Sequence, residues 1–207
     1  MVHTVTPSPY ACFAFEVIVA KLKAHKPKSL SKFIKACKIP KSELVTQPSC
    51  PLFVTWEIGP NEDLRGCIGT FTNIELEQGI KRYAAYAAFE DSRFSPIQVK
   101  HLSELKCDVT ILTDFETCND AYDWTVGVHG IRINFLHLGK THSATFLPSV
   151  AIEHEWDQEE TLMHLVRKSG CKVDHQTIIN MPSFHISRYQ GRKHGASWSD
   201  YEHIINN

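Results

Sequence analysis

The heptapeptide Leu64-Arg65-Gly66-Cys67-Ile68-Gly69-Thr70 places one cysteine between two glycines on an apolar, strand-like stretch. Glycine allows a positive φ angle or a close approach of a ligand to the backbone. The neighbouring arginine favours a thiolate and also attracts anions. We therefore interpret this stretch as a candidate site, and the elements around it set the expected fold.

The residues on both sides of this heptapeptide predict a hairpin followed by a helix. The β-rich run Leu52–Ile58 and the turn-forming residues 59–63 come first, so Leu64–Phe71 is expected to return antiparallel to the first run. Thr72 and Glu75 have the spacing of a capping box, which predicts a helix from Ile74 to about Glu90. Cys67 would then lie within a few residues of a positive helix end, although the cap would occupy part of it.

The rest of the chain predicts an α+β fold built mainly on antiparallel strands. A Ser8 cap and apolar periodicity predict a helix at Pro9–Leu22, and periodicity predicts two more at Leu30–Lys38 and Asp157–Ser169. Alternation predicts strands at Asp108–Thr113, on both sides of a His129-Gly130 turn within Thr125–Phe135, at Ser143–Pro148 and at Phe184–Tyr189. Gly130 is expected to supply a left-handed turn conformation. The polar residues from Gly191 onward are expected to form a surface tail.

Composition excludes several classes of protein. The chain has 207 residues, 43% of them hydrophobic, and a formal net charge of −1, which argues against disorder and against a dedicated nucleic-acid binder. The eight lysines between Lys21 and Lys41 are interpreted as a solvated helix face. The apolar run Ala11–Ala20 is too short to span a bilayer, and the first residues lack a signal-peptide pattern.

The cysteines indicate a reducing compartment. There are seven, an odd number without CxxC spacing, which fits reduced thiols in the cytoplasm or nucleus. The twelve histidines form no HExxH or clustered pattern, so we expect no metal site, and no cofactor is indicated.

Two interpretations of the chemistry stay open. Cys67 is a candidate nucleophile or redox thiol, with Arg65 stabilising its thiolate and His129 as a candidate base. Alternatively, Cys67 is a small buried apolar residue and His129 only a turn residue.

The arginines also allow two interpretations. Arg65 and Arg93, with the amides of residues 66–70, could hold a phosphate or carboxylate. They could equally pair with Asp63 or Asp91 and hold two loops together.

Five ordered motifs resemble the AMMECR family. These are Leu64–Thr70, Asp91–Phe94, Gly127–Ile131, Ala144–Pro148 and the helix from Glu155-Trp156 to Lys168-Ser169-Gly170. The likeness covers roughly Pro9 to Tyr189, and it departs from the family at Ser92 and Ser95, where proline is frequent. It implies an antiparallel sheet flanked by helices with a smaller strand-rich subdomain. It also implies an association with Memo-type and radical-SAM proteins, because the family is fused to or encoded beside them in some bacteria and archaea.

We therefore expect a single AMMECR-type domain over residues 1–207, with a structured core at about 9–190 and a polar tail at 191–207. Its expected function is the binding of an anionic small molecule in a cleft, with or without thiol chemistry at Cys67. The alternative is a non-catalytic protein-interaction or scaffold domain. The ligand-binding candidates are Arg65, Gly66, Gly69, Thr70, Asp91, Arg93, Phe94, Gly130, Thr145 and Phe146, and the catalytic candidates are Cys67 and His129.

Overall fold

The computed structural model describes residues 7–207, so the first six residues of the expected domain lie outside it. The chain divides into two compact units. The first contains the chain up to Ile111 together with Arg192–Asn207, and the second contains Leu112–Gly191. Strands β3 (Leu105–Thr117) and β6 (His185–Ser197) each contribute residues to both units.

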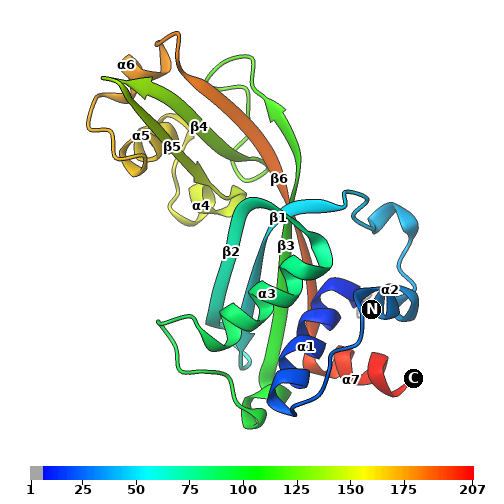
Figure 1. The fold of residues 1–207 in the computed structure, drawn as a ribbon. Helices are drawn as coiled ribbons and strands as arrows, with labels where there is room; N and C mark the ends of the chain where they lie inside the picture. The colour runs from blue at the N-terminus through cyan, green and yellow to red at the C-terminus, as the bar shows by residue number, and fades with distance from the viewer. Residues whose placement is uncertain (1–6) are drawn as a thin grey trace. The chain divides into compact units, whose positions relative to one another are not determined.

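The first unit is a helix-covered antiparallel sheet with the strand order β2–β1–β3–β6. Its remaining elements are α1 (Pro9–Leu22), α2 (Leu30–Cys37), the 3-10 turn η1 (Lys41–Glu43), β1 (Ser49–Ile58), β2 (Asp63–Glu75), α3 (Leu76–Phe89), the 3-10 turn η2 (Val99–Glu104) and α7 (Trp198–Asn206). Helix α3 packs on β1 and β2, and α1 packs against α2, α3 and α7 (Figure 1).

Helix α1 begins where the sequence predicts. The Ser8 hydroxyl accepts a hydrogen bond from the Tyr10 amide at 3.2 Å, and Pro9 occupies the first turn, where its missing N–H costs nothing. Every residue from Pro9 to Ala20 is buried, including Glu16. The Glu16 carboxylate accepts hydrogen bonds from the Lys28 amide and the Tyr201 hydroxyl, which satisfies a charge that would otherwise be costly inside the core.

The predicted hairpin of β1 and β2 is confirmed, and its two faces differ. Leu52, Val54 and Trp56 are buried towards the helices, whereas the alternate positions Phe53 and Thr55 are only half-buried. Side chains alternate across a strand, so β1 has one face in the core and one open face.

The helix start predicted at Thr72 is wrong. Strand β2 continues to Glu75, because Ile74 pairs with Cys50 and Glu75 with Ser49. Glu75 itself caps α3 by accepting hydrogen bonds from the amides of residues 77 and 78. Cys67 consequently lies in the middle of a strand, eight residues before the cap of α3 rather than near its first turn.

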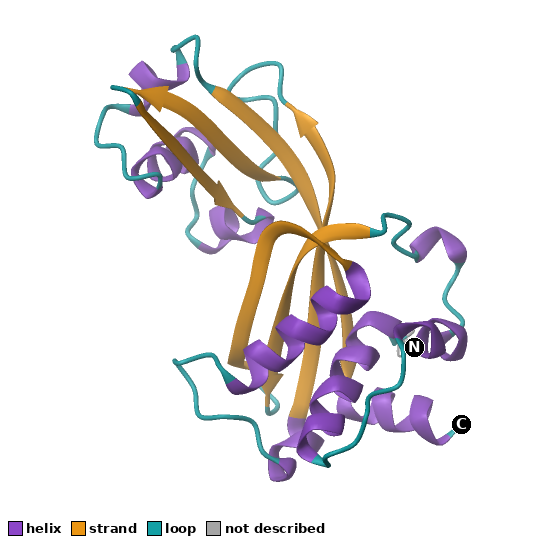
Figure 2. Ribbon diagram, in the orientation of Figure 1, coloured by secondary structure: helices purple, strands orange, loops and turns teal. Residues whose placement is uncertain are grey.

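The second unit pairs its strands in the order β3–β6–β4–β5. Its further elements are β4 (Gly130–His137), β5 (Lys140–Phe146), α4 (Pro148–Glu153), α5 (Gln158–Lys168) and α6 (His175–Ile179). Helix α5 packs beside β5 (Figure 2) and begins at Asp157, whose capping box is formed with Glu160. The core of this unit consists mainly of Leu162, Leu165, Val166, Ile131, Ile133, Phe135 and Ile178.

Two local predictions in the second unit are wrong. Residues 125–129 form a turn rather than a strand, so His129 does not join two strands. The left-handed glycine of this turn is Gly127, with φ +77°, and not Gly130. Gly130 is required for a different reason, since a Cβ there would lie 2.5 Å from the Tyr189 ring.

The residues expected to form a polar surface tail are ordered and partly buried. Residues up to Ser197 complete β6, and Trp198–Asn206 form α7, whose Tyr201 is 4% exposed. The Ser197 and Asp200 side chains form a capping box at the start of α7. Tyr201 stacks on Phe15 and donates to the buried Glu16, which fixes the helix to the core.

These features confirm an α+β fold with a mainly antiparallel sheet flanked by helices and a second strand-rich part. No helix within residues 7–207 is long and apolar enough to cross a membrane.

Candidate functional site

Cys67 lies opposite Thr55 in the β1–β2 pair, on the open face of the first unit's sheet. The Thr55 hydroxyl donates a hydrogen bond to the Cys67 sulfur at 3.2 Å. All seven cysteines are free, and Cys67 is the one that is not buried. The thiol is therefore accessible and has a polar partner.

Asp91 and Arg93 hold the outer edge of β2 at Cys67. Asp91 accepts the Cys67 amide at 2.9 Å, and Arg93 donates to the Cys67 carbonyl at 3.3 Å. The two side chains also form an ion pair at 2.7 Å. The Arg93 guanidinium, followed by the Cys67 amide, holds the pKa of the buried Asp91 carboxyl well below its usual value. The interpretation in which an arginine pairs with Asp91 is correct for Arg93.

Arg65 is the extra residue of a β-bulge, because Gly66 pairs with Trp56 and Leu64 with Glu57. A bulge redirects the side chain of its extra residue. The Arg65 side chain is buried, and its Nη2 donates to the Ser95 carbonyl at 2.5 Å. Its Nη1 is also buried and has no hydrogen-bond partner in the described part of the chain.

Arg65 and Arg93 meet at Phe94. Their guanidinium carbons lie 6.0 and 5.3 Å from the centre of the Phe94 ring, within the range of a cation–π contact. Two cations therefore approach one ring, and among the described residues a carboxylate pairs with Arg93 but not with Arg65. The sequence-predicted residues Arg65, Asp91, Arg93 and Phe94 are thus brought together.

The glycines of the heptapeptide are packed against protein atoms. A Cβ on Gly66 would lie 2.0 Å from the Ala87 carbonyl oxygen of α3. A Cβ on Gly69 would lie 2.3 Å from the Leu52 carbonyl oxygen and 2.4 Å from the Phe53 ring. The Thr70 hydroxyl accepts the Thr72 amide within its own strand. These three residues shape the strand.

His129 and Gly130 belong to the second unit, so the structure does not place them in the Cys67 cluster. Nδ1 of His129 accepts the Thr125 amide at 3.0 Å, which closes the turn. With Nδ1 as acceptor, the neutral ring carries its proton on Nε2. The role of His129 as a base stays a prediction, and its observed hydrogen bond serves the turn.

Thr145 and Phe146 also belong to the second unit, where they surround Tyr189 and Lys168. The Tyr189 hydroxyl lies 2.9 Å from the Thr145 hydroxyl and donates to the Phe146 carbonyl. Lys168 donates to the Thr145 carbonyl, and its ammonium lies 4.6 Å from the centre of the Phe146 ring. Burial lowers the pKa of Lys168.

Thr55, Asp108 and Lys193 were not predicted as site residues, yet they continue the polar row that begins at Cys67. Asp108 lies opposite Thr55 in the β1–β3 pair, and it forms an ion pair with Lys193 at 2.7 Å. The row therefore crosses four neighbouring strands of the first unit. The described residues contain no group of three or more His, Cys, Asp or Glu side chains that could hold a metal ion.

Comparison with known proteins gives the family. The profile of the AMMECR1 family matches residues 11–194, which include every candidate site residue. The chain belongs to the AMMECR1 family. The resemblance seen in the sequence is thereby confirmed.

The AMMECR1 relatives include uncharacterized proteins from fungi and plants. One from Kluyveromyces lactis is 38% identical over 95% of this chain and 94% of its own length. One from Saccharomyces cerevisiae is 36% identical over 94% and 87%. One from Arabidopsis thaliana is 40% identical over 73% and 72%.

A solved structure carries the same AMMECR1 fold. The crystal structure of an uncharacterized protein from Pyrococcus horikoshii matches with a TM-score of 0.62 and 24% identity. The match covers 89% of this chain and 88% of that one. At this identity the likeness concerns the fold alone, and it agrees with the α+β architecture described above.

Proposed function

We propose that the first unit binds a small anionic molecule, a carboxylate or a phosphate, at the cluster of Arg65, Arg93 and Phe94. The observation that carries this proposal is the buried Nη1 of Arg65, which has no partner among the described residues. A buried donor without an acceptor costs about 1–3 kcal/mol, and more when it is charged. An anion supplies both the missing acceptor and the missing charge.

The accessible Cys67 thiol gives this site a reactive group at its edge. Arg93 connects Cys67 with the proposed anion site, because it donates to the Cys67 carbonyl and also lies against Phe94. We extend the proposal to thiol chemistry at this site, with Cys67 as the reactive group and the Thr55 hydroxyl as the donor that orients its sulfur.

The binding step is tested with inorganic phosphate and acetate as probes, measured as shifts in melting temperature. Both the wild type and Arg82→Gln, which removes an exposed arginine on α3, should be stabilised as the anion concentration rises. Arg65→Met keeps a long flexible side chain but removes the guanidinium, so its melting temperature should not respond. An equal response in Arg65→Met and Arg82→Gln contradicts the proposal.

The alternative of a protein-interaction domain is favoured by one observation. Leu138, at the turn between β4 and β5, is 91% exposed, and Leu136 beside it is 53% exposed. Adjacent exposed apolar side chains are typical of interaction surfaces. A protein with this function alone would show no dependence on Arg65 in the anion titration, so the same experiment separates the two functions.

A further inference from the structure

A cavity of about 510 Å³ lies between α2 and the end of α7, away from the Arg65 cluster. Its volume falls within the range of about 300–1,000 Å³ that is usual for small-molecule sites. The lining residues come only from these two helices of the first unit: Lys32, Phe33, Lys35, Ala36, Ile204, Ile205, Asn206 and Asn207.

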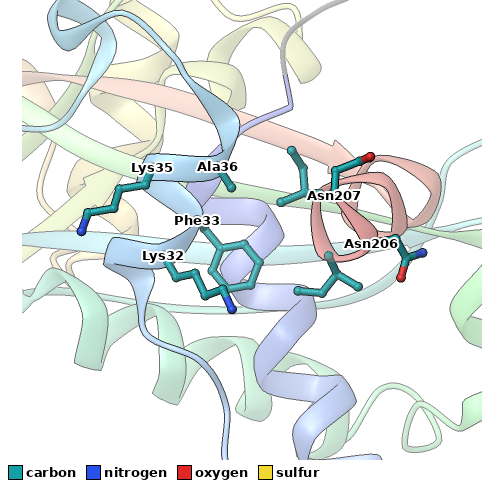
Figure 3. Close-up of a pocket in the computed structure, with 8 residues that line it drawn as sticks. Lys32, Phe33, Lys35, Ala36, Asn206 and Asn207 are labelled. Atoms are coloured by element: carbon teal, nitrogen blue, oxygen red, sulfur yellow. The ribbon is translucent and has the colours of Figure 1, made fainter.

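The interior of this cavity is apolar. Phe33 is 1% exposed and belongs to the core, and Ile204 and Ile205 pack against that core from α7. Figure 3 shows the Phe33 ring between the two helices, with the Ala36 side chain directed towards α7. A hydrocarbon chain would therefore find aliphatic contacts with the half-buried Ile204 and Ile205 of α7, above the buried Phe33.

The rim of the cavity is basic. Lys32 and Lys35 are exposed, and neither forms an ion pair with another described residue. No acidic residue occurs in the sequence between Glu16 and Glu43, and none lines the cavity. In Figure 3 the Lys32 side chain lies beside Phe33, whereas Lys35 extends away from α7. Exposed lysines change rotamer within nanoseconds, so Lys35 can also turn towards the mouth of the cavity.

We propose that this cavity binds a single-chain amphiphile with an anionic head group, a carboxylate or a phosphate monoester. The head lies at Lys32, with Lys35 as a second cation, and the hydrocarbon chain lies against Ile204 and Ile205. The lysines at the rim favour an anionic head group, and the apolar side chains inside the cavity favour a hydrocarbon chain. This site is independent of the anion site proposed at Arg65.

Calorimetric titration of the full chain with decanoate tests the proposal, and methyl NMR shifts locate the site. Decanoate should bind saturably and move the methyl resonances of Ile204 and Ile205. Acetate lacks the tail and decanol lacks the charge, so both should bind much more weakly. Lys32→Gln/Lys35→Gln should bind decanoate about threefold to tenfold more weakly, because exposed ion pairs contribute modestly. The matched variant Lys23→Gln/Lys26→Gln removes two exposed lysines that do not line the cavity, and it should bind like the wild type.

Three results would overturn the proposal. The first is an equal loss of affinity in both double variants, which would indicate a diffuse basic surface. The second is decanoate binding that leaves the Ile204 and Ile205 methyl resonances unmoved. The third is binding only to anionic phosphatidylglycerol vesicles and not to decanoate or decyl phosphate below their micelle concentrations, which would indicate membrane attraction. Free amphiphile is the supported source when decyl phosphate binds in the absence of vesicles.

Discussion

Replacing Gly66 by alanine tests whether the heptapeptide glycines serve packing or ligand approach. The added Cβ would lie 2.0 Å from the Ala87 carbonyl oxygen and 3.0 Å from its carbonyl carbon, whereas ordinary contact begins at 3.4 Å. Helix α3 would have to retreat from β2 by about 1.4 Å. The obstacle is backbone, so no rotamer change can relieve it.

The cost follows from this geometry. Overpacking a core costs about 1–3 kcal/mol when side chains can shift. A retreat of α3 also strains the hydrogen bond from the Trp56 indole to the Ala84 carbonyl, which contributes about 1 kcal/mol. We therefore expect Gly66→Ala to lower the free energy of unfolding by about 2–4 kcal/mol.

Urea unfolding followed by tryptophan fluorescence measures this loss, since Trp56 is fully buried beside α3. Gly59→Ala is the control: its Cβ meets nothing within 4 Å, but φ is +77°, so backbone strain alone should cost about 1–2 kcal/mol. A Gly66→Ala protein as stable as the wild type, yet unresponsive to phosphate, would show that this glycine admits a ligand.

Three further predictions follow from single side chains. Asp91→Asn should lower the free energy of unfolding by about 1–3 kcal/mol at neutral pH. The substitution removes the ion pair with Arg93 and weakens the hydrogen bond from the Cys67 amide. The pKa of Asp91 is depressed in the folded protein, so the stabilisation by its carboxylate is present above the ordinary pKa of 3.8 and is lost as the pH falls below it. Urea unfolding at several pH values measures this. A difference in unfolding free energy between Asp91→Asn and the wild type that stays constant down to pH 2 would contradict it. Burial lowers the pKa of His194, so wild-type stability should fall as the pH drops below 6.5, and His194→Phe should flatten that slope in melting curves at pH 7.5 and 5.5; parallel curves would refute it. Iodoacetamide should alkylate Cys67 first in the native protein, because the other six thiols are buried. Peptide mass mapping identifies the alkylated cysteine. A fast phase of alkylation that persists in Cys67→Ser would contradict this expectation.

Local signals in the sequence predict the elements whose ends are set by their own side chains. Ser8 and Asp157 cap α1 and α5 because each accepts a hydrogen bond from the first turn of its own helix. The hairpin of β1 and β2 is predictable for the same reason, since its turn residues and alternation are local. The distribution of residues between two units has no comparable local signal.

The mispredicted elements are those in which distant contacts decide between two local options. Thr72 and Glu75 have capping-box spacing, but pairing with Ser49 and Cys50 keeps this segment in β2 and leaves Glu75 as the cap. The polar segment after Gly191 becomes ordered through Tyr201, whose partner Glu16 lies 185 residues away in sequence.

Because of the bulge at Arg65, the sequence alone does not show that Cys67 lies in one row with Thr55, Asp108 and Lys193. Counting outward from the turn, with Ile58 opposite Asp63, would place Thr55 opposite Gly66. The extra residue shifts the register by one and brings Thr55 opposite Cys67 instead. Without the bulge, Cys67 would face the helices and Gly66 the open side. The accessibility of the thiol thus depends on Arg65, the extra residue of the bulge, whose guanidinium is buried against Ser95.

This dependence sharpens the case for a ligand at Arg65. Packing against α3 explains why residue 66 is a glycine. The hydrogen bonds to the Cys67 backbone explain the presence of Asp91 and Arg93. Neither accounts for a guanidinium at the bulge, because a buried nitrogen without an acceptor destabilises the fold. If Arg65 serves only the fold, through its hydrogen bond to Ser95, the difference in melting temperature between Arg65→Met and the wild type should be the same in phosphate-free and in phosphate buffer. If it binds an anion, the wild type should gain stability relative to Arg65→Met as phosphate is added, and the dependence of that gain on phosphate concentration measures the affinity of the site.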